Sequence, residues 1–336
     1  MRFAGIYAAL AALFSVSADA ATLDTVRGRQ ALICGVSQGA PGFSTVNDKG
    51  EWGGMDVDFC RGLAAVTVGD ATKVKFTPLS SKERFTAIQS GDVDILARNT
   101  TWTMSRDGGG QGLSFIGVLY YDGQGFMVKK KLAVDSAAKL DGAGVCTNTG
   151  TTTELNIADF FRSHGQKYDI VTFEKSDEAI AAYVADRCDV YSTDMSGLYG
   201  YRPRLPNPDE HVILPEVISK EPLGPAVRQG DDQWFKIARW ALFALINAEE
   251  LGVTSKNVDE MKTSPNPEIK RLLGVEGDFG EKIGMPKDWG YQAVKAVGNY
   301  GEMFDRNLGE GSPLKIKRGL NALWNKGGIL YAPPVR

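Results

Sequence analysis

Two stretches of this chain, about a hundred residues apart, repeat one local plan, and this repeat constrains the fold more than any other feature. In the first, a helix pattern beginning at Phe85 and a short strand lead into the polar string 98–106 (RNTTWTMSR). In the second, helix and strand patterns over 180–192 end at Asp194. In both copies the exit residue lies five positions after an aspartate that opens the strand, Asp94 before Asn99 and Asp189 before Asp194. Two such half-sites facing each other would surround one small molecule.

Helix and strand patterns alternate before position 120. Apolar runs typical of buried strands cover 31–36, 73–79 and 93–96. Between them Asp56 is placed to cap one helix, and Ser80 with Glu83 has capping-box spacing at the start of another. This alternation predicts a parallel sheet with helices on its faces.

The same alternation restarts after the turn-rich segment 120–125. Strand patterns cover 143–147 and 170–173, and Thr151 with Glu154 forms a second capping-box pair at a helix start. The two halves of the chain therefore use one plan.

A second break, rich in proline and glycine, spans 218–227, and a strong helix pattern covers 232–250. Open sheets bind ligands beyond the carboxyl ends of their strands, so two lobes joined by two crossing strands would face each other across a cleft. Gly123 and Pro222 lie where the hinges are expected. The predicted division is residues 21–122 and 221–336 for the first lobe and 123–220 for the second.

Residues 1–20 have the pattern of a secretory signal peptide. Arg2 supplies a positive charge, an apolar run follows, and Ala18-Asp19-Ala20 is a small-residue cleavage signal, so we expect cleavage after Ala20 and a soluble periplasmic protein. The apolar run is shorter than the roughly 20 residues that span a bilayer, which disfavours a membrane anchor. The formal net charge of −3 disfavours nucleic acid as a partner.

The chain has four cysteines, an even number that favours disulfides in an exported protein. Three connectivities are possible from the sequence alone. If each half of the cleft is a separate lobe, the economical pairing is Cys34 with Cys60 and Cys146 with Cys188. No CxxC motif occurs and the two histidines stand alone, so we expect no metal site.

The polar exits have the chemistry that an α-amino acid requires, namely a cationic fork, amide donors and an anionic acceptor around one small volume. Arg106 supplies a planar guanidinium that can meet a carboxylate bidentately. The amides of Thr151 and Thr152 lie at a predicted helix start, which favours an anion. Asp194 would oppose the ammonium. Each residue alone has an ordinary structural explanation, but together they lie at strand exits and helix starts of two halves with one plan.

The order and spacing of these motifs resemble the extracellular solute-binding proteins of the polar amino-acid group, and most closely the binding component of general L-amino-acid ABC transporters. The resemblance covers nearly the whole mature chain and rests on 50–58 (GEWGGMDVD), 89–94 (QSGDVD), 98–106, 150–154 (GTTTE) and 189–194. It implies an α/β fold of the two-lobed type II periplasmic-binding class, with a two-strand hinge and the ligand in the cleft between the lobes.

The resemblance also implies roles for individual residues. Arg106 takes the position that binds the ligand carboxylate, and Asp194 the position that holds the ammonium. Asn99 matches a residue that accepts from the ammonium, Thr101 one that serves both ends, and Thr152 one whose backbone amide touches the carboxylate.

Some positions depart from the family pattern. Gly39 stands where many relatives place an aromatic residue over the ligand, Gly42 is inserted in the same loop, and Ser81 replaces an apolar contact. We therefore expect a less hydrophobic and roomier side-chain pocket, with Ser81 and Arg84 at its variable end. The sequence does not rank the amino acids that this pocket prefers.

The resemblance implies a transport receptor that captures a free L-amino acid, closes over it and presents it to a transmembrane permease with a cytoplasmic ATPase. The chain has no GxxxxGK[ST] loop, so a partner would hydrolyse ATP. We expect a monomer without a cofactor and without catalytic residues. The alternative is a prephenate or arogenate dehydratase on the same fold. Such an enzyme needs an acid or base, for which Glu154 could serve, although its capping-box position already explains it. A sensory module is disfavoured because no transmembrane or signalling segment is recognised.

Overall fold

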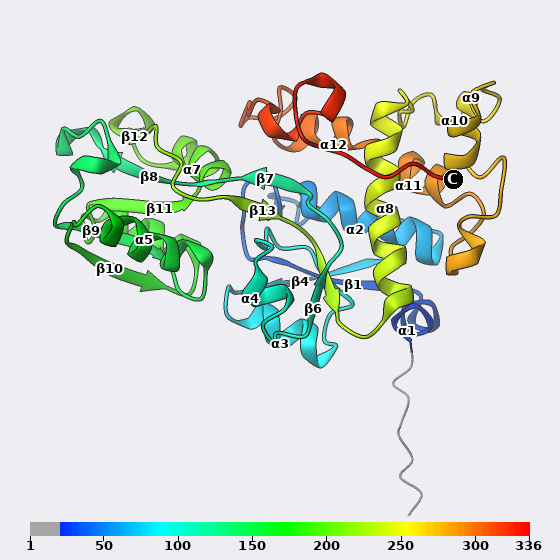
Figure 1. Ribbon diagram of the computed structural model, residues 1–336. Helices are drawn as coiled ribbons and strands as arrows, with labels where there is room; N and C mark the ends of the chain where they lie inside the picture. Colours follow the sequence, from blue (N-terminus) through cyan, green and yellow to red (C-terminus); the bar gives the residue numbers. More distant parts are fainter. Residues whose placement is uncertain (1–20) are drawn as a thin grey trace, which may run out of the picture.

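The computed structural model describes residues 21–336, so the predicted signal peptide lies outside the described residues. Figure 1 shows two lobes side by side, joined by two extended strands. Each lobe is built around a five-stranded sheet accompanied by helices. The predicted two-lobed α/β architecture is confirmed.

The sheet of the first lobe has the strand order β4-β1-β5-β14-β6. Its strands are β1 (Leu32–Ser37), β4 (Val74–Leu79), β5 (Ile95–Leu96), β6 (Leu113–Phe115) and β14 (Ala226–Arg228). β1 runs parallel to β4 and β5, as the alternating pattern predicts. β14 is antiparallel to β5 and β6, so the sheet is mixed and not purely parallel. β2 (Thr45–Val46) and β3 (Trp52–Gly53) form a separate two-stranded antiparallel ribbon.

Helices flank this sheet and form most of the first lobe. They are α1 (Thr22–Arg29), α2 (Met55–Val68), α3 (Glu83–Ser90), α4 (Met104–Asp107), α8 (Asp232–Glu250), α9 (Val258–Met261), α10 (Pro267–Leu272), α11 (Trp289–Val297) and α12 (Tyr300–Asn307). The bounds of α8 match the predicted helix. α8 packs against α2, α11 and α12, and its buried side includes Trp234 and Leu242. None of the helices within residues 21–336 is long and apolar enough to span a bilayer.

The second lobe has the strand order β10-β9-β11-β8-β12. Its strands are β8 (Gln124–Lys129), β9 (Ala143–Asn148), β10 (Tyr168–Phe173), β11 (Val190–Asp194) and β12 (His211–Ile213), and its helices are α5 (Thr152–Ser163), α6 (Ser176–Val184) and α7 (Met195–Tyr201). Successive side chains of β8 enter different cores, because strand residues alternate between faces. Phe126 packs with Phe161 of α5, whereas Met127 packs in a second core with Tyr183 of α6.

The two lobes are connected by an antiparallel pair, β7 (Tyr120–Asp122) and β13 (Glu221–Leu223). The chain enters the second lobe after β7 and returns through β13 (Figure 1). Asp122 lies opposite Glu221 in this pair, so two acidic residues occupy the junction of the lobes.

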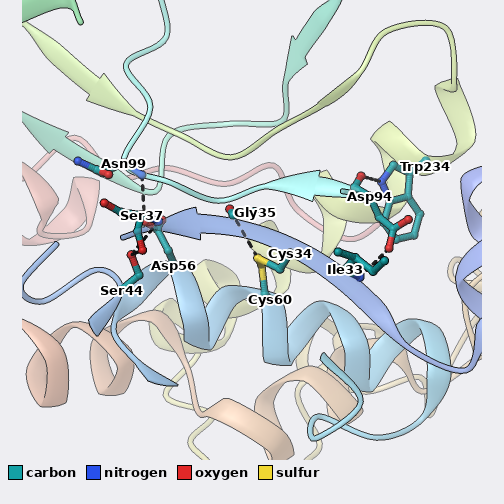
Figure 2. Close-up of a disulfide and its surroundings, with 10 residues drawn as sticks. All are labelled: Ile33, Cys34, Gly35, Ser37, Ser44, Asp56, Cys60, Asp94, Asn99 and Trp234. Atoms are coloured by element: carbon teal, nitrogen blue, oxygen red, sulfur yellow. Dashed lines mark hydrogen bonds between the residues drawn. A yellow bond between two sulfur atoms is a disulfide. The ribbon is translucent and has the colours of Figure 1, made fainter. Parts of the chain in front are cut away.

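Each lobe contains one disulfide. Cys34 of β1 is bonded to Cys60 of α2 (Figure 2), and Cys146 of β9 is bonded to Cys188 just before β11. This is the pairing expected for two separate lobes. Each bond ties a sheet to a neighbouring segment and restricts the unfolded chain, an effect typically worth about 2–4 kcal/mol.

Candidate functional site

A cavity lies between the lobes at the carboxyl ends of the strands. Ser37 ends β1, Ser81 follows β4, Asn99 follows β5, Asn148 ends β9 and Asp194 ends β11. This is where open α/β sheets bind ligands. Seven of the eight predicted binding residues line the cavity, namely Ser81, Arg84, Asn99, Thr101, Thr151, Thr152 and Asp194.

The lobes touch around this cavity. The hydroxyl of Tyr201 in the second lobe donates to the backbone oxygen of Gly39 in the first at 2.8 Å. At another edge Lys82 and Glu174 form an exposed ion pair at 3.3 Å. The cleft is therefore in a closed arrangement, in which one small molecule would contact both lobes.

Asn99 lies at a sharp bend after β5, with φ of 35°, a left-handed conformation that asparagine tolerates better than most residues. Its backbone N–H donates to a carboxylate oxygen of Asp56 at 2.9 Å (Figure 2). The Oδ1 atom of Asn99 is buried and accepts no hydrogen bond from residues 21–336. That oxygen is free to accept a hydrogen bond from a ligand.

Asp56 has a different role from the predicted one. α2 begins at Met55 after Gly54, so Asp56 lies in the first turn, and its side chain holds Asn99 instead of capping the helix. Gly54 is required there because a Cβ atom would lie 2.0 Å from the backbone oxygen of Phe43. Burial raises the pKa of Asp56 to about 7, although the Asn99 N–H and Arg98 lower it.

This pKa predicts a pH dependence of stability. Between the ordinary value of 3.8 and about 7, folded Asp56 keeps a proton that the unfolded chain releases, so the free energy of unfolding falls as pH rises through this window. One proton contributes at most about 1.4 kcal/mol per pH unit. Asp56→Asn should therefore flatten the decline measured by urea denaturation from pH 4.5 to 7.5. Burial raises the pKa of Asp122 to about 6, so the variant should still show a smaller decline of the free energy of unfolding with pH. Equal slopes for both proteins would contradict this assignment.

Arg106 stands behind Thr101 and is not part of the cavity wall. It lies in the short helix α4, whose N-cap Thr103 accepts from the Arg106 N–H at 3.3 Å. One guanidinium nitrogen donates to the backbone oxygen of Thr101 at 2.9 Å, and the group packs over the ring of Phe85. Burial lowers the pKa of Arg106, while the charges of Glu221 and Asp194 act in the opposite direction.

Two further arginines do line the cavity, Arg84 and Arg98. Arg98 donates to the backbone oxygen of Leu79 at 3.0 Å and to the hydroxyl of Ser81 at 3.1 Å. Arg84 is 3% exposed, and its Nε atom is buried without a partner among the described residues. Burial is the main cause that lowers the pKa of both groups. Neighbouring cations also act to lower these pKa values, namely Arg98 and Arg106 for Arg84, and Arg106 for Arg98.

None of these three guanidinium groups forms an ion pair with a carboxylate of residues 21–336. Buried cations are costly unless an anion compensates them. The first-lobe side of the cavity is therefore suited to a carboxylate ligand. α5 adds to this from the second lobe, because the N–H groups of its first turn, from Thr152 onward, have no acceptor within the helix.

The acidic side of the site lies where β11 and the hinge strands meet. Asp194 is the N-cap of α7 but accepts no capping hydrogen bond. Burial first, and then the charges of Asp122 and Glu221, raise its pKa well above the ordinary range, while Arg84 and Arg106 lower it. Asp122 accepts from the hydroxyl of Ser196. Three carboxyl groups thus converge at one end of the cavity, which suits an ammonium.

Sequence reasoning missed several residues of this site. Arg98 lies within the polar string, but no pattern indicates which arginine faces the cavity. Asp122 and Glu221 directly precede the predicted hinge residues Gly123 and Pro222, and acids beside a hinge were the available signal. Nothing in the sequence separates the remaining wall residues from ordinary loop residues; they include Thr147, Ser176 and Tyr201.

The fold defines a class of protein, a two-lobed binding protein with a cavity between its lobes. The family model of the bacterial extracellular solute-binding proteins, family 3, matches residues 32–257. The chain is 59% identical over 335 residues to the general L-amino acid-binding periplasmic protein AapJ of Rhizobium johnstonii, covering 99% of this chain and 98% of that protein. It is 51% identical to the glutamate/glutamine/aspartate/asparagine-binding protein BztA of Rhodobacter capsulatus, with 98% and 97% covered.

A solved structure agrees with these matches. An ABC transporter periplasmic binding protein from Brucella ovis, with glutathione bound, superposes with a TM-score of 0.92 at 59% identity, covering 95% of this chain and 100% of that one. The chain belongs to family 3 of the bacterial extracellular solute-binding proteins. Its relatives are binding proteins and not enzymes, so the dehydratase alternative is not favoured.

Proposed function

We propose that this protein is the periplasmic receptor of an amino-acid ABC transporter, binds L-amino acids of broad range as a monomer and delivers them to a transmembrane permease with a cytoplasmic ATPase. Export would follow cleavage after Ala20. The names of the relatives support amino acids as the ligand class and an ABC transporter as the partner.

The observation that carries this proposal is the separation of charge in the cavity. Arginines lacking an ion pair gather on the first-lobe side, and carboxyl groups gather where the second lobe meets the hinge. In this proposal Arg106, which stands behind Thr101, and the α5 amides at Thr151 and Thr152 bind the carboxylate. Asp194 and the free oxygen of Asn99 bind the ammonium.

Ser81 and Arg84 would face the ligand side chain. Arg84 contacts the hydroxyl of Thr100 and the backbone oxygen of Gly150 only at 3.4 Å each, so stronger acceptors on a ligand could replace these contacts. A polar wall of this kind suits acidic and amide side chains, and it offers little apolar surface that would select a single aliphatic one.

Ligand binding would favour the closed arrangement, because only then does one molecule touch both lobes. The test is a thermal-shift screen of the purified protein, without residues 1–20, against the twenty L-amino acids. A ligand at 100 times its dissociation constant adds about 2.7 kcal/mol, or about 4 °C in melting temperature for a protein of this size. Stabilisation by many amino acids is expected, and stabilisation only by sugars or metal ions would reject the proposal.

A second candidate ligand is glutathione, which the Brucella ovis relative holds. Glutathione carries a free α-amino-acid end on its γ-glutamyl residue, so it can present the same two charges. A hollow of about 320 Å³ adjoins the cavity and shares Ser37, Arg98 and Ser176 with it. The remainder of the ligand could extend there, past Gln38 and Lys175.

Blocking this hollow should separate the two ligands. Gln38 is exposed and lines the hollow but not the cavity. Gln38→Trp is expected to weaken glutathione binding at least tenfold in calorimetric titrations and to leave L-glutamine binding unchanged. Gln38→Ala, which adds no bulk, is the matched control. Equal effects of Gln38→Trp on both ligands, or none on glutathione, would contradict an extended ligand in the hollow.

A further inference from the structure

Glu221 is a buried acid that is not part of the cavity wall and that joins both lobes. It lies on hinge strand β13 and is 1% exposed. One carboxylate oxygen accepts from the hydroxyl of Thr101 in the first lobe at 2.5 Å and from that of Thr152 in the second at 2.9 Å. The other accepts from Asn156 at 2.7 Å and from Ser219 at 2.6 Å. These four donors match the acceptor sites of an ionised carboxylate.

This arrangement determines what the two threonine hydroxyls can offer a ligand. Each hydroxyl has a single proton, and Glu221 is the closest acceptor for both, at 2.5 and 2.9 Å against the 3.3 Å that separates the two hydroxyls, so we assign both protons to Glu221. The two hydroxyl oxygens lie 3.3 Å apart, and both threonines line the cavity. With their protons engaged, they can only accept a hydrogen bond from a bound molecule. They cannot donate to a carboxylate.

We propose that Glu221 is a positioning residue that fixes the hydroxyls of Thr101 and Thr152 as acceptors for the ligand ammonium. Glu221 would thereby determine which way an amino acid lies in the cavity and complete the ammonium site formed by Asp194. This proposal rests on the proposed function. It changes the role of Thr101, because the hydroxyl serves the ammonium end alone.

Alternative arrangements of the hydroxyls show why the charge matters. A neutral glutamine at position 221 has an amide group that can donate to Thr101 and Thr152. The hydroxyls could then rotate and donate into the cavity, where they would favour a carboxylate over an ammonium. The same change of residue keeps the volume and shape of the side chain, so packing in the hinge should be preserved.

The test compares Glu221→Gln with the wild-type protein on two ligands, L-glutamine and its des-amino analogue 4-carbamoylbutanoate, by calorimetric titration. We expect L-glutamine to bind the variant at least tenfold more weakly and 4-carbamoylbutanoate to bind it unchanged or more tightly. The preference for the ammonium-bearing ligand should therefore fall at least tenfold. Ser219→Ala is the matched control, because it removes one donor to Glu221 without releasing either threonine.

If Glu221 had a merely structural role, Glu221→Gln would bind both ligands more weakly by the same factor, and that result would overturn the proposal. An unchanged preference would also overturn it. If Glu221→Gln does not fold, Glu221→Asp, whose shorter arm cannot reach both hydroxyls, is expected to lower the same preference. Failure of the proposed function is distinguishable, because the wild-type protein would then bind no L-amino acid at all, which would reject both proposals.

Discussion

Replacing Asp194 by asparagine is expected to raise the dissociation constant for L-amino acids at least 100-fold. The reason is electrostatic. The ammonium of the ligand enters a site where three carboxyl groups converge, and Asp194 is the one that lines the cavity. Losing one partner of a buried charged pair typically costs about 3–5 kcal/mol, which corresponds to a factor of more than 100. Calorimetric titration with the tightest ligand from the thermal-shift screen measures the change.

The unliganded Asp194→Asn protein should be at least as stable as the wild type. Burial and the nearby charges of Asp122 and Glu221 disfavour the ionised form of Asp194, and asparagine removes that repulsion at nearly the same volume. Asp169→Asn is the matched control, because Asp169 is an exposed acid in the same lobe, on β10. Asp169→Asn should bind amino acids like the wild type. If Asp194→Asn also did so, Asp194 would not hold the ammonium.

Replacing Arg106 by alanine should weaken amino-acid binding by a similar factor, at least 100-fold, because a buried carboxylate would lose a two-pronged donor. Arg106→Lys keeps the positive charge but not the planar fork, so we expect an intermediate loss. The ratio of the two effects measured by titration reports how much of the binding depends on the shape of the guanidinium.

Two controls make the Arg106 result specific. Arg162→Ala removes an exposed arginine whose ion pair with Asp159, at 3.6 Å, lies on the surface of α5, and it should not alter binding. Arg84→Ala tests the neighbouring arginine in the wall. If Arg84→Ala lost much of its affinity for amino acids while Arg106→Ala bound them like the wild type, Arg84 and not Arg106 would bind the carboxylate.

Much of the framework was predictable because it depends on local patterns. α8 has the predicted bounds. The Ser80 and Glu83 pair exchanges the two hydrogen bonds of a capping box at the start of α3, and Gly91 is the C-cap of that helix. The second predicted box is only half formed, since Glu154 accepts from Gly150 and not from Thr151. These elements place strand ends next to each other, so the polar exits could be expected to meet.

The remaining parts of the site depend on contacts between residues far apart in the chain. Asp56 has the local pattern of a helix cap, but its partner Asn99 is 43 positions away. Glu221 contacts Thr101 across 120 positions, a pairing that exists only once the hinge and both lobes are in place. The side chain of Arg106 points behind Thr101 because of the turn that begins α4, and single-sequence patterns carry no information about that direction.

The central claim is that one amino acid lies in the cavity with its carboxylate toward Arg106 and the start of α5 and its ammonium toward Asp194. A crystal structure of the protein with L-glutamine bound tests it most directly. We predict the ligand carboxylate within hydrogen-bond distance of the Arg106 guanidinium and the α5 amides, and the ammonium within that distance of Asp194 and the hydroxyls of Thr101 and Thr152. A ligand lying in the opposite direction, or bound outside the cleft, would contradict it.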